Sequence, residues 1–102
     1  MTITVHVTQQ HIDAGHRCDS YKCPIALALH DAFQPHTPNT RGIFAGLENI
    51  YGRIGDQRMC WVTPTRVRMF IYDFDQPIPC APFSFTLDTE HALEVEQYPP
   101  VD

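Results

Sequence analysis

Two histidines and two cysteines near the start of the chain have side chains that could bind a metal ion. They are His11, His16, Cys18 and Cys23. Structural zinc sites usually hold four Cys or His ligands in a tetrahedron, with two to four residues between the cysteines of a pair and a second pair elsewhere. Cys18 and Cys23 have this spacing, and the histidines would supply the second pair. The alternative is a buried structural Cys23 with histidines on the surface.

Cys23 is also a candidate for thiol chemistry. It directly precedes Pro24, which suits the first turn of a helix, so Cys23 is predicted to be the N-cap. Aligned backbone dipoles at that position would stabilise a thiolate, and Cys18 would be the resolving thiol. Redox enzymes more often have Cys-x-x-Cys, and cysteine is among the most frequently buried residues. A structural role for Cys23 is therefore the alternative here too.

Most of the arginines are concentrated in the middle of the chain, and two of them oppose each other in a predicted hairpin. Arg53 and Arg58 lie opposite each other, on the face that also carries Tyr51. Like charges directly opposite in a sheet are unfavourable. An anionic partner would relieve this repulsion.

A second pair of arginines lies in the helix predicted after this hairpin. Arg66 and Arg68 occupy its first turns, and Asp73 and Asp75 occupy its last. Both placements oppose the helix dipole, at a cost of roughly a few tenths of a kcal/mol each. Residues that break such local preferences are expected at functional sites.

Together these observations predict a binding surface for a nucleic acid, a nucleotide or an acidic protein. It would consist of Arg53, Arg58, Arg66, Arg68 and Tyr51. The alternative is that the arginine stems cover apolar surface and pair with Glu48 or Asp56.

The motifs of common enzyme classes are absent from the sequence. Ser20 and Ser84 are the only serines, and neither lies in Gly-x-Ser-x-Gly. The chain has neither a Gly-x-x-x-x-Gly-Lys phosphate loop nor a Gly-x-Gly-x-x-Gly turn. No residue is therefore assigned a catalytic role, and the sequence favours binding over catalysis.

Length and composition predict one small globular domain without a membrane span. The chain has 102 residues, of which 43% are apolar. No run approaches the roughly 18 apolar residues that a spanning helix needs. The N-terminus alternates and lacks a basic flank, which is not typical of a signal peptide. We therefore expect a cytoplasmic protein with reduced thiols, in the host cytoplasm if a phage encodes it.

Acidic residues dominate the last third of the chain. All seven Lys and Arg residues lie at or before Arg68, whereas residues 69–102 contain seven acids. Residues 90–102 have few apolar side chains and contain Tyr98-Pro99-Pro100. We therefore expect residues 1–88 to form the domain and residues 89–102 to be a loose acidic tail.

The most apolar run, residues 23–33, predicts the element around which the fold is built. A helix that is apolar most of the way round must be buried, and Leu27 lies at its middle. Strands are predicted over residues 3–7 and 83–87, where apolar and polar residues alternate. Thr8 is the expected N-cap of a short helix that Gly15 ends in a left-handed conformation.

The clearest hairpin signal lies in the middle of the chain. Residues 50–54 and 57–62 flank Gly55-Asp56, which suits a type II′ turn. In this register Ile50, Ile54, Met59 and Trp61 face the core. Thr63 then caps an amphipathic helix that begins at Pro64. The predicted class is α+β, with a small, mostly antiparallel sheet packed on a buried helix and an amphipathic helix.

Three segments of the chain resemble a family of small proteins from bacteriophages and environmental bacteria. The similar segments are His11-Ile12-Asp13-Ala14-Gly15, residues 23–28 and residues 82–87. The family has no assigned activity. The resemblance therefore implies a small accessory protein of phage type and contributes no catalytic residue.

The sequence as a whole favours a non-enzymatic accessory protein that binds another macromolecule, either protein or nucleic acid, without a cofactor. The alternative is a zinc or thiol protein that uses Cys18, Cys23 and the nearby histidines.

Overall fold

The protein consists of two antiparallel sheets with helices between them. The computed structural model describes residues 1–97, with side chains for residues 1–93. The elements, in chain order, are β1 (Thr2–Val7), α1 (Gln9–Ala14), α2 (Pro24–Phe33), η1 (Gln34–His36), β2 (Phe44–Ala45), β3 (Asn49–Ile54), β4 (Gln57–Val62), α3 (Thr65–Asp75), β5 (Phe83–Asp88), η2 (Thr89–His91) and β6 (Glu94–Gln97).

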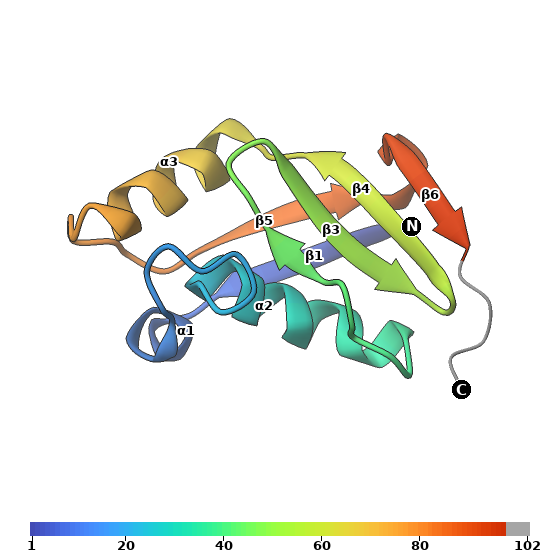
Figure 1. Cartoon of the computed structure of the whole chain (residues 1–102), viewed down its shortest axis with the longest axis horizontal. Coiled ribbons are helices and arrows are strands. Elements are labelled where there is room, and N and C mark those ends of the chain that lie inside the picture. Colours follow the sequence, from blue (N-terminus) through green and yellow to red (C-terminus); the bar gives the residue numbers. More distant parts are fainter. Residues whose placement is uncertain (98–102) are drawn as a thin grey trace.

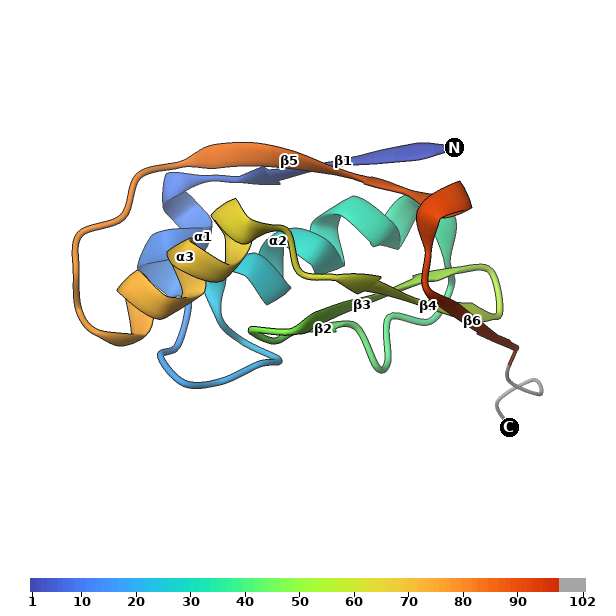
Figure 2. The same ribbon diagram turned by 90° about the horizontal axis from the view of Figure 1, so that it is seen from above.

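The α+β class is confirmed, but the predicted single sheet is wrong. The first and last predicted strands pair with each other, as β1 and β5, in a two-stranded ribbon. The hairpin belongs to a separate sheet with strand order β2-β3-β4-β6. Figure 2 shows the ribbon on one side of the helices and the larger sheet on the other. This arrangement covers α2 from two sides, as an apolar helix requires.

Helix α2 is the centre of the core, as predicted. Cys23 is its N-cap, with Sγ accepting the backbone N–H of Ala26 at 3.4 Å. The largest fully buried side chains of α2 are Ile25, Leu29 and Phe33. Leu27, at the middle of the predicted buried helix, is only half-buried. It lies on the same side of α2 as half-buried His30 and exposed Asp31, which is the side turned away from the core.

The β3–β4 hairpin has the predicted register. Ile50 pairs with Trp61, and Arg53 pairs with Arg58 across the two strands. Gly55 has φ +59°, which a type II′ turn requires at its first central position. A Cβ on Gly52 would lie 2.4 Å from Cζ of Phe33, so glycine is needed where α2 crosses β3. The hairpin can approach α2 this closely only because Gly52 has no side chain.

Two predicted helix ends differ in detail. Gly15 is extended, with φ −71°, and not left-handed; it is a glycine because a Cβ would lie 2.5 Å from the ring of Pro24. Thr63 is not the cap of α3. Its buried hydroxyl donates to the carbonyl of Gly46 at 2.7 Å, and α3 begins after Pro64 without a side-chain cap.

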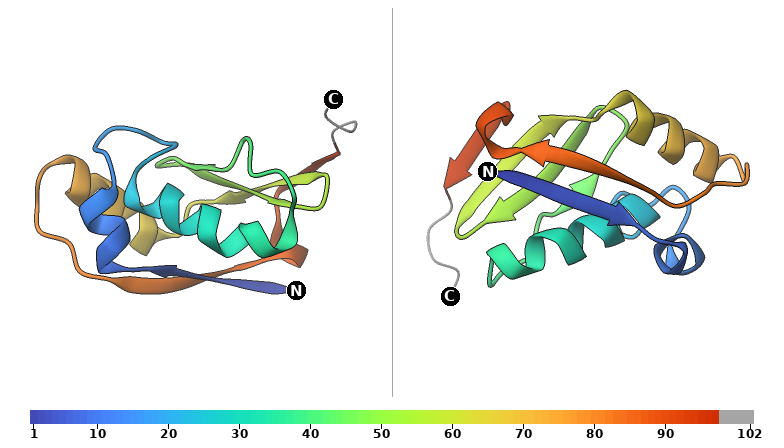
Figure 3. Two further views of the ribbon diagram at one scale, coloured as in Figure 1. Left: turned by 90° about the horizontal axis from the view of Figure 1, so that it is seen from below. Right: turned by 180° about the vertical axis from the view of Figure 1, so that it is seen from behind.

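The segment after β5, which was predicted to be a loose tail, forms η2 and β6 in the part that the structure describes. The indole Nε1 of Trp61 donates to the carbonyl of Asp88 at 2.9 Å, where the chain leaves the ribbon. It then forms η2 and crosses to the other sheet, where β6 pairs with β4. Figures 1 and 3 show this crossing at one end of the molecule. Of the predicted tail, residues 98–102 lie outside the described residues.

Candidate functional site

A hollow of the surface lies between three segments that are far apart in sequence. It has a volume of about 590 Å³ and is bounded by residues 18–20, by the β2–β3 turn, and by α3. The backbone N–H of Ala45 donates to the carbonyl of Ser20 at 2.9 Å and holds the first two segments together. Buried Cys23, Ala45 and Ile71 contribute to its lining.

A row of aromatic rings runs beside this pocket. Phe44 and Tyr51 are register partners on β2 and β3, and their rings stack with centroids 4.4 Å apart. The exposed ring of Tyr21 leans against Phe44 at 5.2 Å. At the other end of the row, the guanidinium of Arg58 lies 4.1 Å from the centroid of Tyr51. The row thus already accepts one cation, by the attraction between a guanidinium and an aromatic face.

Three carboxylates line the pocket, and its lining includes no Lys, Arg or His. They are Asp19, Glu48 and Asp75. Asp19 Oδ1 accepts the N–H groups of Tyr21 and Lys22, which fixes the loop. Asp75 Oδ1 accepts the N–H of Cys18 at 2.9 Å. Within the described residues, none of these three carboxylates has a cation within ion-pair distance. The pocket therefore has an unbalanced negative charge.

The two cysteines of this pocket differ in environment. Cys18 is exposed and has φ +55°, a conformation that costs energy for any residue with a Cβ. Burial raises the pKa of the Cys23 thiol above its ordinary value and outweighs the hydrogen bonds from Ala26 and Ile25 that lower it. Asp75 and Asp19 raise the pKa of Cys23 further. The predicted thiolate at the helix N-terminus is therefore disfavoured.

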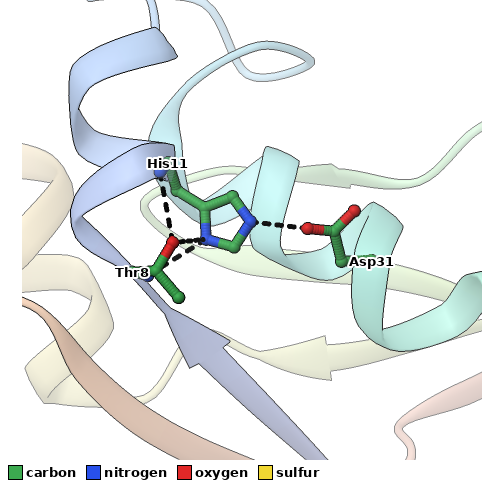
Figure 4. Close-up of polar contacts among 3 residues, drawn as sticks. All are labelled: Thr8, His11 and Asp31. Atoms are coloured by element: carbon green, nitrogen blue, oxygen red, sulfur yellow. Dashed lines mark hydrogen bonds and ion pairs between the residues drawn. The ribbon is translucent and has the colours of Figure 1, made fainter.

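The residues predicted to bind zinc do not form a site in the structure. His11 is the third residue of α1, and its Nδ1 accepts the backbone N–H of Thr8 at 3.0 Å. Its Nε2 therefore carries the proton and donates to Asp31 Oδ2 at 2.6 Å (Figure 4). His11 thus caps α1 and joins it to α2. Within the described residues, no group of three or more His, Cys, Asp or Glu side chains is placed to hold a metal ion.

The arginine pair of the hairpin is not an exposed patch. Arg53 is only 5% exposed, and its Nη1 donates to the carbonyl of Arg41 at 3.0 Å. Arg58 is half-buried and lies over Tyr51. The alternative, in which arginine stems cover apolar surface, describes this pair better. The predicted exposure is wrong for Arg53, because a loop residue, Arg41, supplies the carbonyl that accepts from its buried guanidinium.

The arginines of α3 lie away from that pair, beyond the far end of β4. Both are exposed. The guanidinium of Arg66 lies 4.8 Å from the ring centroid of Phe83, and Arg68 Nε donates to the carbonyl of Leu47 at 3.1 Å. The predicted surface is therefore divided, and α3 supplies its accessible part.

The acidic pocket was not predicted from the sequence. Its carboxylates come from a loop, a turn and the end of a helix, so no local spacing connects them. Asp75 was considered only as a charge at the end of its helix. The predicted hairpin is an anticipated element in this region, and its first strand contributes Asn49 and Tyr51 to the lining.

Among the described residues, none of the helices is both long and apolar enough to cross a membrane. Comparisons with protein-family models, with curated proteins and with solved structures found no match. The resemblance to phage proteins therefore stays a prediction.

Proposed function

We propose that the protein is a non-enzymatic binding protein whose pocket accepts a positively charged segment of a protein partner. The observation that supports this most is the charge of the pocket: three carboxylates line it, and no basic side chain does. A segment containing Arg or Lys would place its cation among these carboxylates, where partial exclusion of water strengthens the attraction.

The aromatic row supports the same class of partner. Tyrosine and arginine are enriched at sites that dominate protein–protein binding energy. The exposed edge of the row, at Tyr21, lies next to the loop that carries Asp19. A guanidinium from a partner could stack there as Arg58 does at the other end of the row. Apolar parts of the partner would contact the exposed side chain of Leu47 at the pocket rim.

This proposal keeps the predicted class, macromolecular binding, and changes the predicted charge of the partner. A nucleic acid would bring phosphates against carboxylates, which is unfavourable. An accessory role of phage type, as the resemblance implies, would suit a small binding protein. For the zinc or thiol alternative, no specific contact in the described residues provides support.

The test is a binding titration with a dye-labelled seven-residue peptide that contains three arginines, followed by fluorescence anisotropy. The Asp19→Asn and Glu48→Gln double variant keeps the size of both side chains and the Oδ1 acceptor of residue 19. We expect it to bind at least about fivefold more weakly than the unmodified protein, because two nearby charges are lost. The matched control, Asp56→Asn with Glu90→Gln, removes two exposed acids elsewhere and should change affinity less than about twofold. Equal losses in both double variants would show only nonspecific attraction and would refute the pocket.

A further inference from the structure

The outward face of α3 is apolar at its centre and is not covered by any described part of the chain. Val67, Phe70 and Ile71 face the core, whereas Met69 is 61% and Tyr72 is 57% exposed. Figure 1 shows α3 along the outer border of the molecule. Two hollows, of about 280 and 570 Å³, lie on either side of this face, and Met69 and Asp73 line both. Exposed apolar groups beside hollows are typical of an interaction surface.

The charges of α3 are arranged against its own dipole. Its first turn contains no acid and two exposed arginines, Arg66 and Arg68. Its last turn contains Asp73 and Asp75 and no basic residue. Within the described residues none of these four side chains is in an ion pair. In the single chain, these charges therefore destabilise α3 slightly.

The spacing of these charges is regular. Arg66 precedes Asp73 by seven residues, as Arg68 precedes Asp75. Seven residues are two helical turns, about 10.5 Å along the axis, so each pair lies on one side of the helix. Met69 and Tyr72 lie between the basic end and the acidic end. This arrangement is self-complementary under a two-fold rotation that reverses the helix direction.

We propose that two copies of the chain pair through α3, with the two helices antiparallel. The two-fold axis passes between Met69 and Tyr72, so these side chains from both copies form the apolar centre. Arg66 then lies beside Asp73 of the second copy, and Arg68 beside Asp75 of the second copy. The contact is isologous and closed, because each copy presents the same surface to the other.

Charge complementarity identifies a second copy as the occupant of this face. In an antiparallel pair, α3 of the second copy places Asp73 and Asp75 opposite Arg66 and Arg68. The two helix dipoles are also antiparallel, so the basic first turn of each copy lies beside the carbonyl end of the other. The proposed interface shares Asp75 with the acidic pocket. The two proposals are therefore tested at different residues: the pocket at Asp19 and Glu48, and the dimer at Arg66 and Asp73.

An interface formed by one 11-residue helix and its flanks is small. Small interfaces with exposed ion pairs are weak and sensitive to salt. We therefore expect dimerisation with a dissociation constant of about 1–100 µM, weakening as the salt concentration rises.

Charge reversal provides the test, with sedimentation equilibrium as the measurement. In the dimer, Arg66→Asp would place the new carboxylate beside Asp73 of the second copy. Asp73→Arg would place the new guanidinium beside Arg66 of the second copy. Each variant alone should dimerise at least about tenfold more weakly than the unmodified protein. An equimolar mixture of the two should form heterodimers, because residue 66 of one variant again meets its opposite charge at residue 73 of the other. Arg41→Asp and Asp56→Arg, the matched reversals at exposed sites outside α3, should leave dimerisation unchanged.

Three results would overturn the proposal. They are a monomer mass at all concentrations up to about 1 mM, a dimer unaffected by either reversal, and two weakened variants that fail to pair when mixed. Circular dichroism of each variant shows whether it is folded. If either reversal prevents folding, Met69→Gln at the apolar centre takes its place and must weaken the dimer by the same tenfold criterion.

Discussion

Replacing Gly52 with alanine tests the packing of α2 against the larger sheet. The new Cβ would lie 2.4 Å from Cζ of Phe33, whereas carbon atoms in contact are normally about 3.5–4.0 Å apart. Phe33 is fully buried, so its ring cannot move into solvent. One of the two elements must therefore shift by more than about 1 Å.

The expected loss of stability is about 2–3 kcal/mol, in the upper part of the range for overpacking a core. For a domain of this size, 2 kcal/mol corresponds to a fall in melting temperature of roughly 8–16 °C. Without the clash, alanine would stabilise the chain by about 0.4–1 kcal/mol by restricting the unfolded state. Urea denaturation followed by tryptophan fluorescence measures the difference.

Two variants make this prediction specific to the contact. In Gly46→Ala the new Cβ would lie 3.4 Å from its nearest atom, so the change in the free energy of unfolding should stay within about 0.5 kcal/mol. Phe33→Leu removes the atoms that collide with the new Cβ. In the double variant with Gly52→Ala, the loss should be smaller than the sum of the two single losses by at least about 1 kcal/mol. Additive losses, or a Gly52→Ala effect equal to that of Gly46→Ala, would refute the described packing.

Three further predictions follow from burial and strand pairing. Leu29→Ala should cost about 3–5 kcal/mol because Leu29 is fully buried, and half-buried Leu27→Ala should cost less than half as much; equal losses in chemical denaturation would contradict this difference. Iodoacetamide should label exposed Cys18 at least about tenfold faster than Cys23 at pH 8, because burial raises the pKa of the Cys23 thiol and keeps it protonated. Mass spectrometry of the labelled native protein measures both rates, and faster labelling of Cys23 would contradict the prediction. Removing residues 92–102 should lower the melting temperature by at least about 4 °C, because β6 pairs with β4. An unchanged melting temperature would show that this segment does not stabilise the domain and would favour the loose tail.

The elements that were predicted correctly have local causes. Pro24 at the first helical position and the apolar run after it specify α2. Alternating side chains on both sides of Gly55-Asp56 specify the hairpin and its register. Signals of this kind involve neighbours along the chain, so they can be read without knowing the fold.

The features that were missed depend on contacts between distant segments. The pairing of β1 with β5 joins Thr2 to Asp88, and no local pattern distinguishes one sheet from two. The burial of Arg53 depends on a carbonyl acceptor at Arg41, which is contributed by a loop. The acidic pocket likewise exists only after three segments meet. The sequence showed that the charges of α3 oppose its helix dipole. It did not show which opposite charges would lie beside them.

The most direct test of the proposed function is to locate binding by NMR. Amide shifts of the protein are compared during titration with the arginine-containing peptide and, separately, with a short DNA duplex at the same salt concentration. The proposal predicts that the peptide shifts amides of residues 18–20, 44–49 and 71–75, and that the duplex leaves them unchanged. Shifts caused by the duplex and centred on Arg53 and Arg58, with none from the peptide, would contradict it.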